Sequence, residues 1–122
     1  MNIKIGMNML LWGIEITQEH IPIFEGLADA GYDGVEIPVI GQSSTDLKAM
    51  ASACDDLGLE RTAVAFVVEN ANPISPDSSI RSAAVDGLKK AIDDSKLIGA
   101  DFLVGGIYQF RFNLAVQHRQ FT

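Results

Sequence analysis

The chain is poor in cysteine, in positive charge and in long apolar runs. Its single cysteine, Cys54, has no second thiol with which to form an internal disulfide, and it is best explained as a small buried hydrophobe in a reducing cytoplasm. Lysine and arginine total 9 against 16 acidic residues, and a net charge of -7 disfavours broad nucleic-acid binding because phosphates would be repelled. The N-terminal residues have no extended apolar core, so we expect neither a signal peptide nor a membrane span.

Common catalytic signatures are missing as well. No G-x-G-x-x-G follows an apolar run, so a dinucleotide-binding fold lacks its fingerprint. No serine or cysteine stands in a recognisable nucleophile setting. His20 and His118 have no partner residues at metal-binding spacing, and we expect neither histidine to bind a metal.

A glycine, one spacer and an acidic residue recur between apolar segments, at Gly31 to Asp33, Gly58 to Glu60 and Gly99 to Asp101. A glycine past the last helical turn can adopt the left-handed conformation that closes a helix, and the next apolar run can then form a strand. Helices and strands therefore alternate, which is typical of a parallel sheet covered by helices.

The apolar pattern predicts four strands, at residues 3–9, 34–39, 61–68 and 102–106. The first helix is expected to open at Thr17 or His20, and the second at Ser44 or Thr45. The third is expected to run from an N-cap at Ser75 to Ile98, with Ile80, Ala84, Leu88, Ala91 and Ile98 on its core face and Arg81, Asp86, Lys89, Lys90, Asp93 and Asp94 in solvent.

Two stretches resemble a known family: residues 2–12, NIKIGMNMLLW, and residues 30–38, AGYDGVEIP. They are similar to the opening of the xylose-isomerase-like TIM-barrel superfamily (sugar phosphate isomerases and epimerases), and within it most of all to the D-tagatose and D-psicose (allulose) 3-epimerases. The resemblance implies an α/β fold, the N-terminal half of a (β/α)8 barrel with about four strands and three helices. We expect it to cover residues 1–106 and to leave residues 107–122 as an atypical C-terminal tail.

The resemblance also implies what the chain lacks. A full barrel needs about 250 residues. In the epimerases two glutamates, an aspartate and a histidine on later strands hold the divalent metal, Mn, Mg or Co, and the glutamates move the substrate proton. We therefore expect no catalytic or metal-binding residue in this chain, and a truncated or frame-shifted gene is the simplest account.

Three functions remain open at this stage. The full-length form would be a metal-dependent ketose 3-epimerase or sugar (phosphate) isomerase, with a ketose or sugar phosphate as substrate. It would alternatively be a lyase similar to inosose dehydratases, or the chain would be a non-catalytic half-barrel.

Active sites of such barrels lie at the C-terminal ends of the strands, which selects the candidate substrate-binding residues Asn8, Trp12, Glu36, Ala65, Phe66, Gly106 and Tyr108. By resemblance Trp12 belongs to the apolar wall beside the sugar, although it could equally cover the barrel mouth for stability. Gly105 and Gly106 allow either close approach of a ligand or a tight strand exit.

Glu36 stands between Val35 and Ile37. If these two neighbours pack under the helices, alternation along the strand makes Glu36 face the barrel interior. Its carboxylate would be costly to bury alone, so it should bind a sugar hydroxyl, a neighbouring side chain or water.

An open half-barrel also has an unpartnered inner face. We expect Ile5, Val64 and Leu103 to point into it and to favour self-association, with residues 107–122 poorly ordered or lying over the opening.

Overall fold

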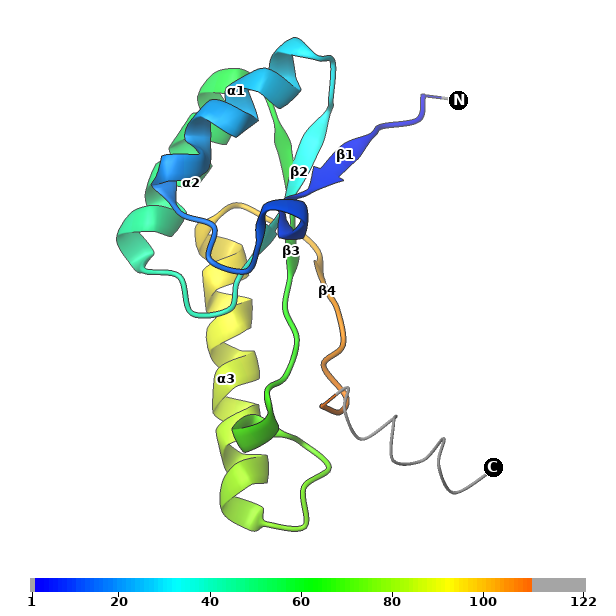
Figure 1. Cartoon of the computed structure of the whole chain (residues 1–122), viewed down its shortest axis with the longest axis vertical. Coiled ribbons are helices and arrows are strands. Elements are labelled where there is room, and N and C mark those ends of the chain that lie inside the picture. Colours follow the sequence, from blue (N-terminus) through cyan, green and yellow to red (C-terminus); the bar gives the residue numbers. More distant parts are fainter. Residues whose placement is uncertain (1, 111–122) are drawn as a thin grey trace.

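The computed structural model describes residues 2–110. Four parallel strands form one sheet in the order β1-β2-β3-β4, and their bounds are Gly6–Asn8 (β1), Gly34–Pro38 (β2), Glu60–Val64 (β3) and Leu103–Val104 (β4). Each strand pairs with its sequence neighbour, as expected of the first strands of a barrel (Figure 1). The predicted α/β arrangement of four parallel strands and three α-helices is confirmed.

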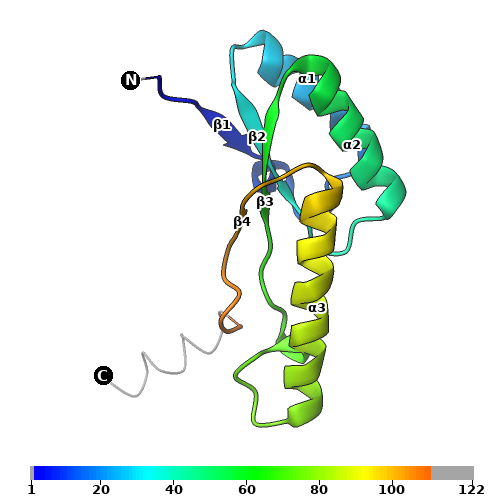
Figure 2. The same ribbon diagram turned by 180° about the vertical axis from the view of Figure 1, so that it is seen from behind.

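Three α-helices connect the strands: α1 (Ile21–Asp29), α2 (Ser44–Leu57) and α3 (Ser78–Leu97). Short 3-10 helices, η1 (Met9–Trp12), η2 (Gln18–His20) and η3 (Glu69–Ala71), complete the connections. All three α-helices lie on one side of the sheet, and both views leave its other face uncovered by residues 2–110 (Figures 1 and 2). No helix within residues 2–110 combines the length and apolarity needed to cross a membrane.

The core lies between the sheet and the helices. Phe24 of α1, Leu47 and Met50 of α2, and Ile37 of β2 are fully buried there. A Phe or Leu side chain contributes roughly 1.5–3 kcal/mol on full burial. The apolar burial that stabilises the fold therefore lies mainly on the helix side of the sheet. The opposite face contributes less to stability and can carry a site.

The three punctuating glycines close the helices as predicted. Gly31, Gly58 and Gly99 have φ values of 94°, 68° and 77°, in the region that favours glycine.

The strands are shorter than predicted, and the first and fourth end at a local backbone feature. The first ends at Asn8, because the Asn8 side chain accepts a hydrogen bond from Leu10 N and so begins η1. The third ends at Val64, although Ala65 N and Val67 N still donate to Val104 O and Gly106 O. The fourth ends at Val104, because Gly105 has a φ of 135°.

Two predicted helix caps were displaced. The second helix is capped by Ser43, whose hydroxyl oxygen accepts from Asp46 N at 3.1 Å. The third is capped by Asp77, whose Oδ1 accepts from Ser79 N at 2.8 Å. Hydrogen bonds from Ser79 hold the pKa of Asp77 below its usual value. Ser75 instead accepts from Asp77 N and forms the turn before the helix.

Asp94 of α3 corrects the predicted solvent face. It is 8% exposed, and Lys90 one turn earlier donates to its Oδ2 at 2.6 Å. A buried carboxylate requires such a partner, and only the packing of α3 on the sheet reveals that Asp94 is buried.

Cys54 is expected to resist thiol reagents in the folded chain. Its side chain is fully buried on α2, and burial raises the pKa of its thiol to about 11. At pH 8 about one thiol in a thousand is then ionised, and only the thiolate reacts. Labelling with a disulfide reagent should be slow in buffer and fast in guanidinium chloride. An added thiol at the exposed position Ser82 (Ser82→Cys) serves as the control, and equal native rates at the two thiols would contradict the packing of α2.

Candidate functional site

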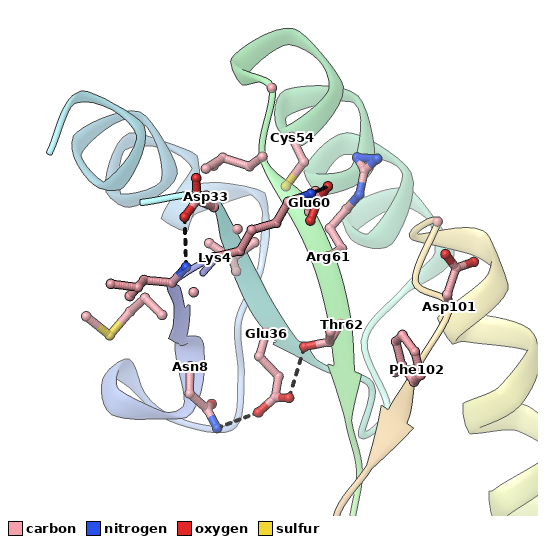
Figure 3. Close-up of a pocket in the computed structure, with 18 of the residues that line it drawn as sticks. Lys4, Asn8, Asp33, Glu36, Cys54, Glu60, Arg61, Thr62, Asp101 and Phe102 are labelled. Carbon is pink, nitrogen blue, oxygen red and sulfur yellow. Dashed lines mark hydrogen bonds and ion pairs between the residues drawn. The ribbon is translucent and has the colours of Figure 1, made fainter. Parts of the chain in front are cut away.

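A depression of about 710 Å³ lies at the N-terminal edge of the sheet and extends onto the uncovered face, and its lining also includes Cys54 and Asp55 of α2 (Figure 3). Much of its wall comes from the N-terminal ends of the strands, where Lys4, Asp33, Glu60 and Asp101 lie. In barrel enzymes the chemistry occurs at the opposite, C-terminal ends. The residues of this depression that lie toward those ends are Asn8, Glu36 and Thr62, and they define the candidate site.

Asn8, Glu36 and Thr62 form a hydrogen-bonded row across three adjacent strands (Figure 3). The register places Asn8 opposite Glu36 and Glu36 opposite Thr62. Asn8 Nδ2 donates to Glu36 Oε2 at 2.8 Å, and Thr62 Oγ1 donates to Glu36 Oε1 at 2.9 Å. Both carboxylate oxygens thus have a partner from a neighbouring strand.

The orientation of Glu36 is confirmed. Val35 and Ile37 are buried in the core on the helix side, and Glu36 contacts Asn8 and Thr62 on the other face. Of the partners considered from sequence, neighbouring side chains are the ones present.

Trp12 is the last residue of η1 and is 41% exposed. The turn that carries it begins where Asn8 Oδ1 accepts from Leu10 N at 2.9 Å. Beyond the turn, Gln42 Nε2 donates to Ile14 O at 2.8 Å. The structure therefore connects three sequence candidates, Asn8, Glu36 and Trp12, through one network.

Ala65 and Phe66 line a second hollow, an apolar groove of about 300 Å³ that also involves α3. Ala65 is 4% exposed and belongs to the helix-side core. These two candidates are thus part of a different hollow from the Asn8–Glu36–Thr62 row.

Gly106 and Tyr108 follow β4. Gly106 O accepts from Val67 N at 3.2 Å, and Tyr108 is 64% exposed. A Cβ on Gly105 would lie 1.8 Å from Ala65 O, which favours the tight-exit explanation for this glycine pair.

Three polar residues that were not among the sequence candidates also organise the sheet and the loops around it: Thr62, Gln42 and Asn72. Thr62 holds Glu36, and its signal was a lone hydroxyl in an apolar strand. Gln42 is 8% exposed and joins the loops after β1 and β2 through Ile14 O and Ile40 N. Asn72 is 6% exposed, and its Oδ1 accepts from Ile74 N and Phe110 N at 3.3 Å each. Each of the three also has a partner 26 to 38 positions away, which no local pattern could identify.

The inner face also differs in part from expectation. Leu103 pairs with Ala63 and packs against the helix-side core. Ile5 lies two residues before Met7, so it belongs to the same face of the sheet as Met7, which also packs against that core. Val64 shares the phase of Thr62 and is on the inner face as expected, but it is 7% exposed. The exposed apolar residues of that face are Phe102, at 68%, and Val104, at 46%.

Charged residues fix the N-terminal edge of the same face. Lys4 forms an ion pair with Glu60, which raises the pKa of Lys4. Asp33 Oδ2 accepts from Ile5 N at 2.7 Å and so ties the chain before β1 to the start of β2. These contacts connect the N-terminal ends of β1, β2 and β3.

No three His, Cys, Asp or Glu side chains of residues 2–110 come close enough together to hold a metal ion. The described residues therefore do not fit the divalent metal that the family resemblance implies.

Comparison with known proteins identifies the class of fold. A model of the family described as xylose isomerase-like TIM barrel matches residues 24–120. The chain belongs to this family. The match extends past residue 106, where the resemblance was expected to end, although residues 111–122 lie outside the described part of the structure.

Individual relatives are sugar epimerases. The ketose 3-epimerase of Arthrobacter globiformis is 29% identical over 106 residues, which are 86% of this chain and 37% of that protein. The D-allulose 3-epimerase of Methylomonas sp. in complex with D-allulose superposes with a TM-score of 0.75 at 23% identity, and the D-psicose 3-epimerase of Clostridium cellulolyticum H10 with D-tagatose superposes with 0.76 at 20%. Each superposition covers 88% of this chain and 38% of the other. The chain thus spans little more than a third of the length of these relatives.

Proposed function

We propose that this chain is the N-terminal part of a ketose 3-epimerase, or of a related sugar (phosphate) isomerase. The observation that carries the proposal is the Asn8–Glu36–Thr62 row and the Trp12 turn attached to it, on the face that a barrel encloses. Membership of the family and the ketose 3-epimerase relative support the reaction class.

In this proposal each residue has a limited task. Trp12 offers an aromatic face to the carbon side of a ketose or sugar phosphate, and Asn8 and Glu36 offer polar groups to its hydroxyls. Gly106 and Tyr108 complete the rim, whereas Ala65 and Phe66, which line the separate groove beside α3, have no direct task at this site. Following the family resemblance, this proposal assigns proton transfer and any binding of Mn, Mg or Co to residues outside 2–110. The division into residues 1–106 and a tail of 107–122 and the cytoplasmic location are part of the same proposal.

A chimeric barrel tests the proposal. Residues 2–106 of this chain would be joined to the part of the Arthrobacter enzyme that follows its matched region. The chimera should epimerise a ketohexose in the presence of Mn²⁺, and a chelator should abolish the turnover, whereas the 122-residue chain alone should show none. A folded chimera without turnover, or turnover by the chain alone, would refute the proposal.

Trp12 supplies the specific control. In the chimera, Trp12→Ala should lower kcat/KM by about tenfold, equivalent to about 1.4 kcal/mol of lost contact in the transition state. Ile92→Ala on the outer surface of α3, where Ile92 is 59% exposed, should leave kcat/KM unchanged. If Trp12→Ala lowers only the melting temperature, Trp12 covers the barrel mouth and does not bind sugar.

We further propose that the chain alone associates with itself. A parallel sheet is normally covered on both faces, and here β1 and β4 are edge strands of residues 2–110 with Phe102 and Val104 exposed beside them. Burying even about 400 Å² of such surface contributes roughly 10 kcal/mol before the cost of association.

A further inference from the structure

Glu36 belongs to a chain of hydrogen bonds that ends at the tryptophan-bearing turn. Its Oε2 accepts from Asn8 Nδ2, and the other end of the same amide, Asn8 Oδ1, accepts from Leu10 N at the start of η1. Figure 3 shows Asn8 and Glu36 pointing toward one another from β1 and β2. Asn8 is thus the link between a carboxylate on one strand and a turn after another.

The chemistry of these groups determines the orientation of the amide. An ionised carboxylate only accepts hydrogen bonds, so Asn8 must turn its NH₂ group toward Glu36. The carbonyl oxygen of Asn8 then faces the backbone of η1, where it can accept from Leu10 N. Without the carboxylate the Asn8 amide could rotate, and the turn would lose its N-cap.

The turn has further anchors on both sides of Trp12. Met9, the first residue of η1, is fully buried in the core, and Gly13 N donates to Leu10 O at 3.1 Å. Beyond Trp12, which is 41% exposed, Gln42 Nε2 donates to Ile14 O. The packing of Met9 and the Asn8 cap therefore fix the near end of the turn together, and the Asn8 cap is the part that depends on Glu36.

We propose that Glu36 is a positioning residue that sets the orientation of Trp12 by fixing the amide of Asn8. The consequence for sugar binding rests on the proposed function, because it needs Trp12 to be the aromatic wall of the site. The effect of Glu36 on the conformation of the Trp12 turn does not rest on the proposed function.

Trp12 is the only tryptophan of the chain, so its fluorescence reports on this turn alone. Glu36→Ala and Asn8→Ala should each increase acrylamide quenching of Trp12, by up to about twofold as the side chain goes from 41% exposed toward full exposure. The double variant should show no further increase, because both residues act through one link. Glu36→Gln should restore the native signal, since the one oxygen of its amide can take the place of Glu36 Oε2 and accept from Asn8 Nδ2, while its NH₂ group donates to Thr62 Oγ1.

The matched control is Glu60→Ala, which removes an exposed glutamate of β3 that pairs with Lys4 and should leave Trp12 unchanged. Far-UV circular dichroism confirms folding, and sedimentation confirms that all variants are compared in one oligomeric state. If Glu36→Ala fails to fold, Glu36→Leu replaces it, because leucine fills the space without an unpaired polar group.

Three results would overturn the inference: native quenching in a folded Glu36→Ala or Glu36→Leu variant, additive effects in the double variant, or no rescue by Glu36→Gln. A separate titration of the chimera with a ketohexose tests the proposed function. If Trp12 responds to Glu36→Ala but not to the sugar, the positioning role stands and the proposed function fails.

Discussion

Replacing Gly105 by alanine is expected to destabilise the chain by about 3 kcal/mol or more, because two costs add. The first is backbone strain, since the φ of 135° at this residue is rarely adopted by residues with a side chain. The second is a clash, since the new Cβ would lie 1.8 Å from Ala65 O, a backbone atom that cannot move without disturbing the β3–β4 pairing.

Gly106→Ala is the matched control for this prediction. A Cβ there meets nothing within 4 Å, and the expected change stays within about 0.5 kcal/mol. Urea unfolding of both variants, at one protein concentration, measures the difference. Equal midpoints would show that the chain does not leave β4 through the tight turn described here.

The second large effect concerns the uncovered face of the sheet. The 122-residue chain should associate at micromolar concentration, and Val104→Asp should raise the dissociation constant by at least about tenfold, or about 1.4 kcal/mol. The reason is that Val104, exposed at 46% on the inner face, would bring an unpaired carboxylate into an apolar contact. Phe102→Asp should act in the same way.

Val85→Asp and Ile92→Asp are the controls, because these residues are exposed on α3, at 48% and 59%, away from the inner face. Sedimentation velocity over a concentration series distinguishes the outcomes. A compact monomer at every concentration would refute the proposed association and would indicate that the inner face is covered within one chain. Dissociation by the α3 variants alone would place the contact on the helices instead.

Much of the secondary structure could be predicted from the sequence, because it depends on the local conformational preferences of a few residues. The glycines at 31, 58 and 99 end helices because φ values of 94°, 68° and 77° are accessible to glycine, and the apolar runs after them become strands. The orientation of Glu36 was also predictable, because side chains alternate along a single strand whatever the neighbouring strands are. The family resemblance added the barrel, which the superpositions confirm.

Features that depend on register were not predictable. Leu103 was expected on the inner face, but pairing with Ala63 places it on the helix side and leaves Val104 exposed. Asp94 was expected in solvent, but the packing of α3 buries it beside Lys90. In both cases a short or amphipathic segment fits two orientations, and contacts with distant residues select one.

The sequence by itself thus determined the order of the elements, the C-terminal ends of the helices and the direction of Glu36, since each follows from backbone freedom or from alternation within a segment. Only the tertiary structure decided that Thr62 and Asn8 hold the two oxygens of Glu36, and that Gln42 ties the Trp12 loop to the loop after β2. The physical reason is that these bonds join residues 26 to 28 positions apart, and such pairs meet only when the parallel strands adopt one register.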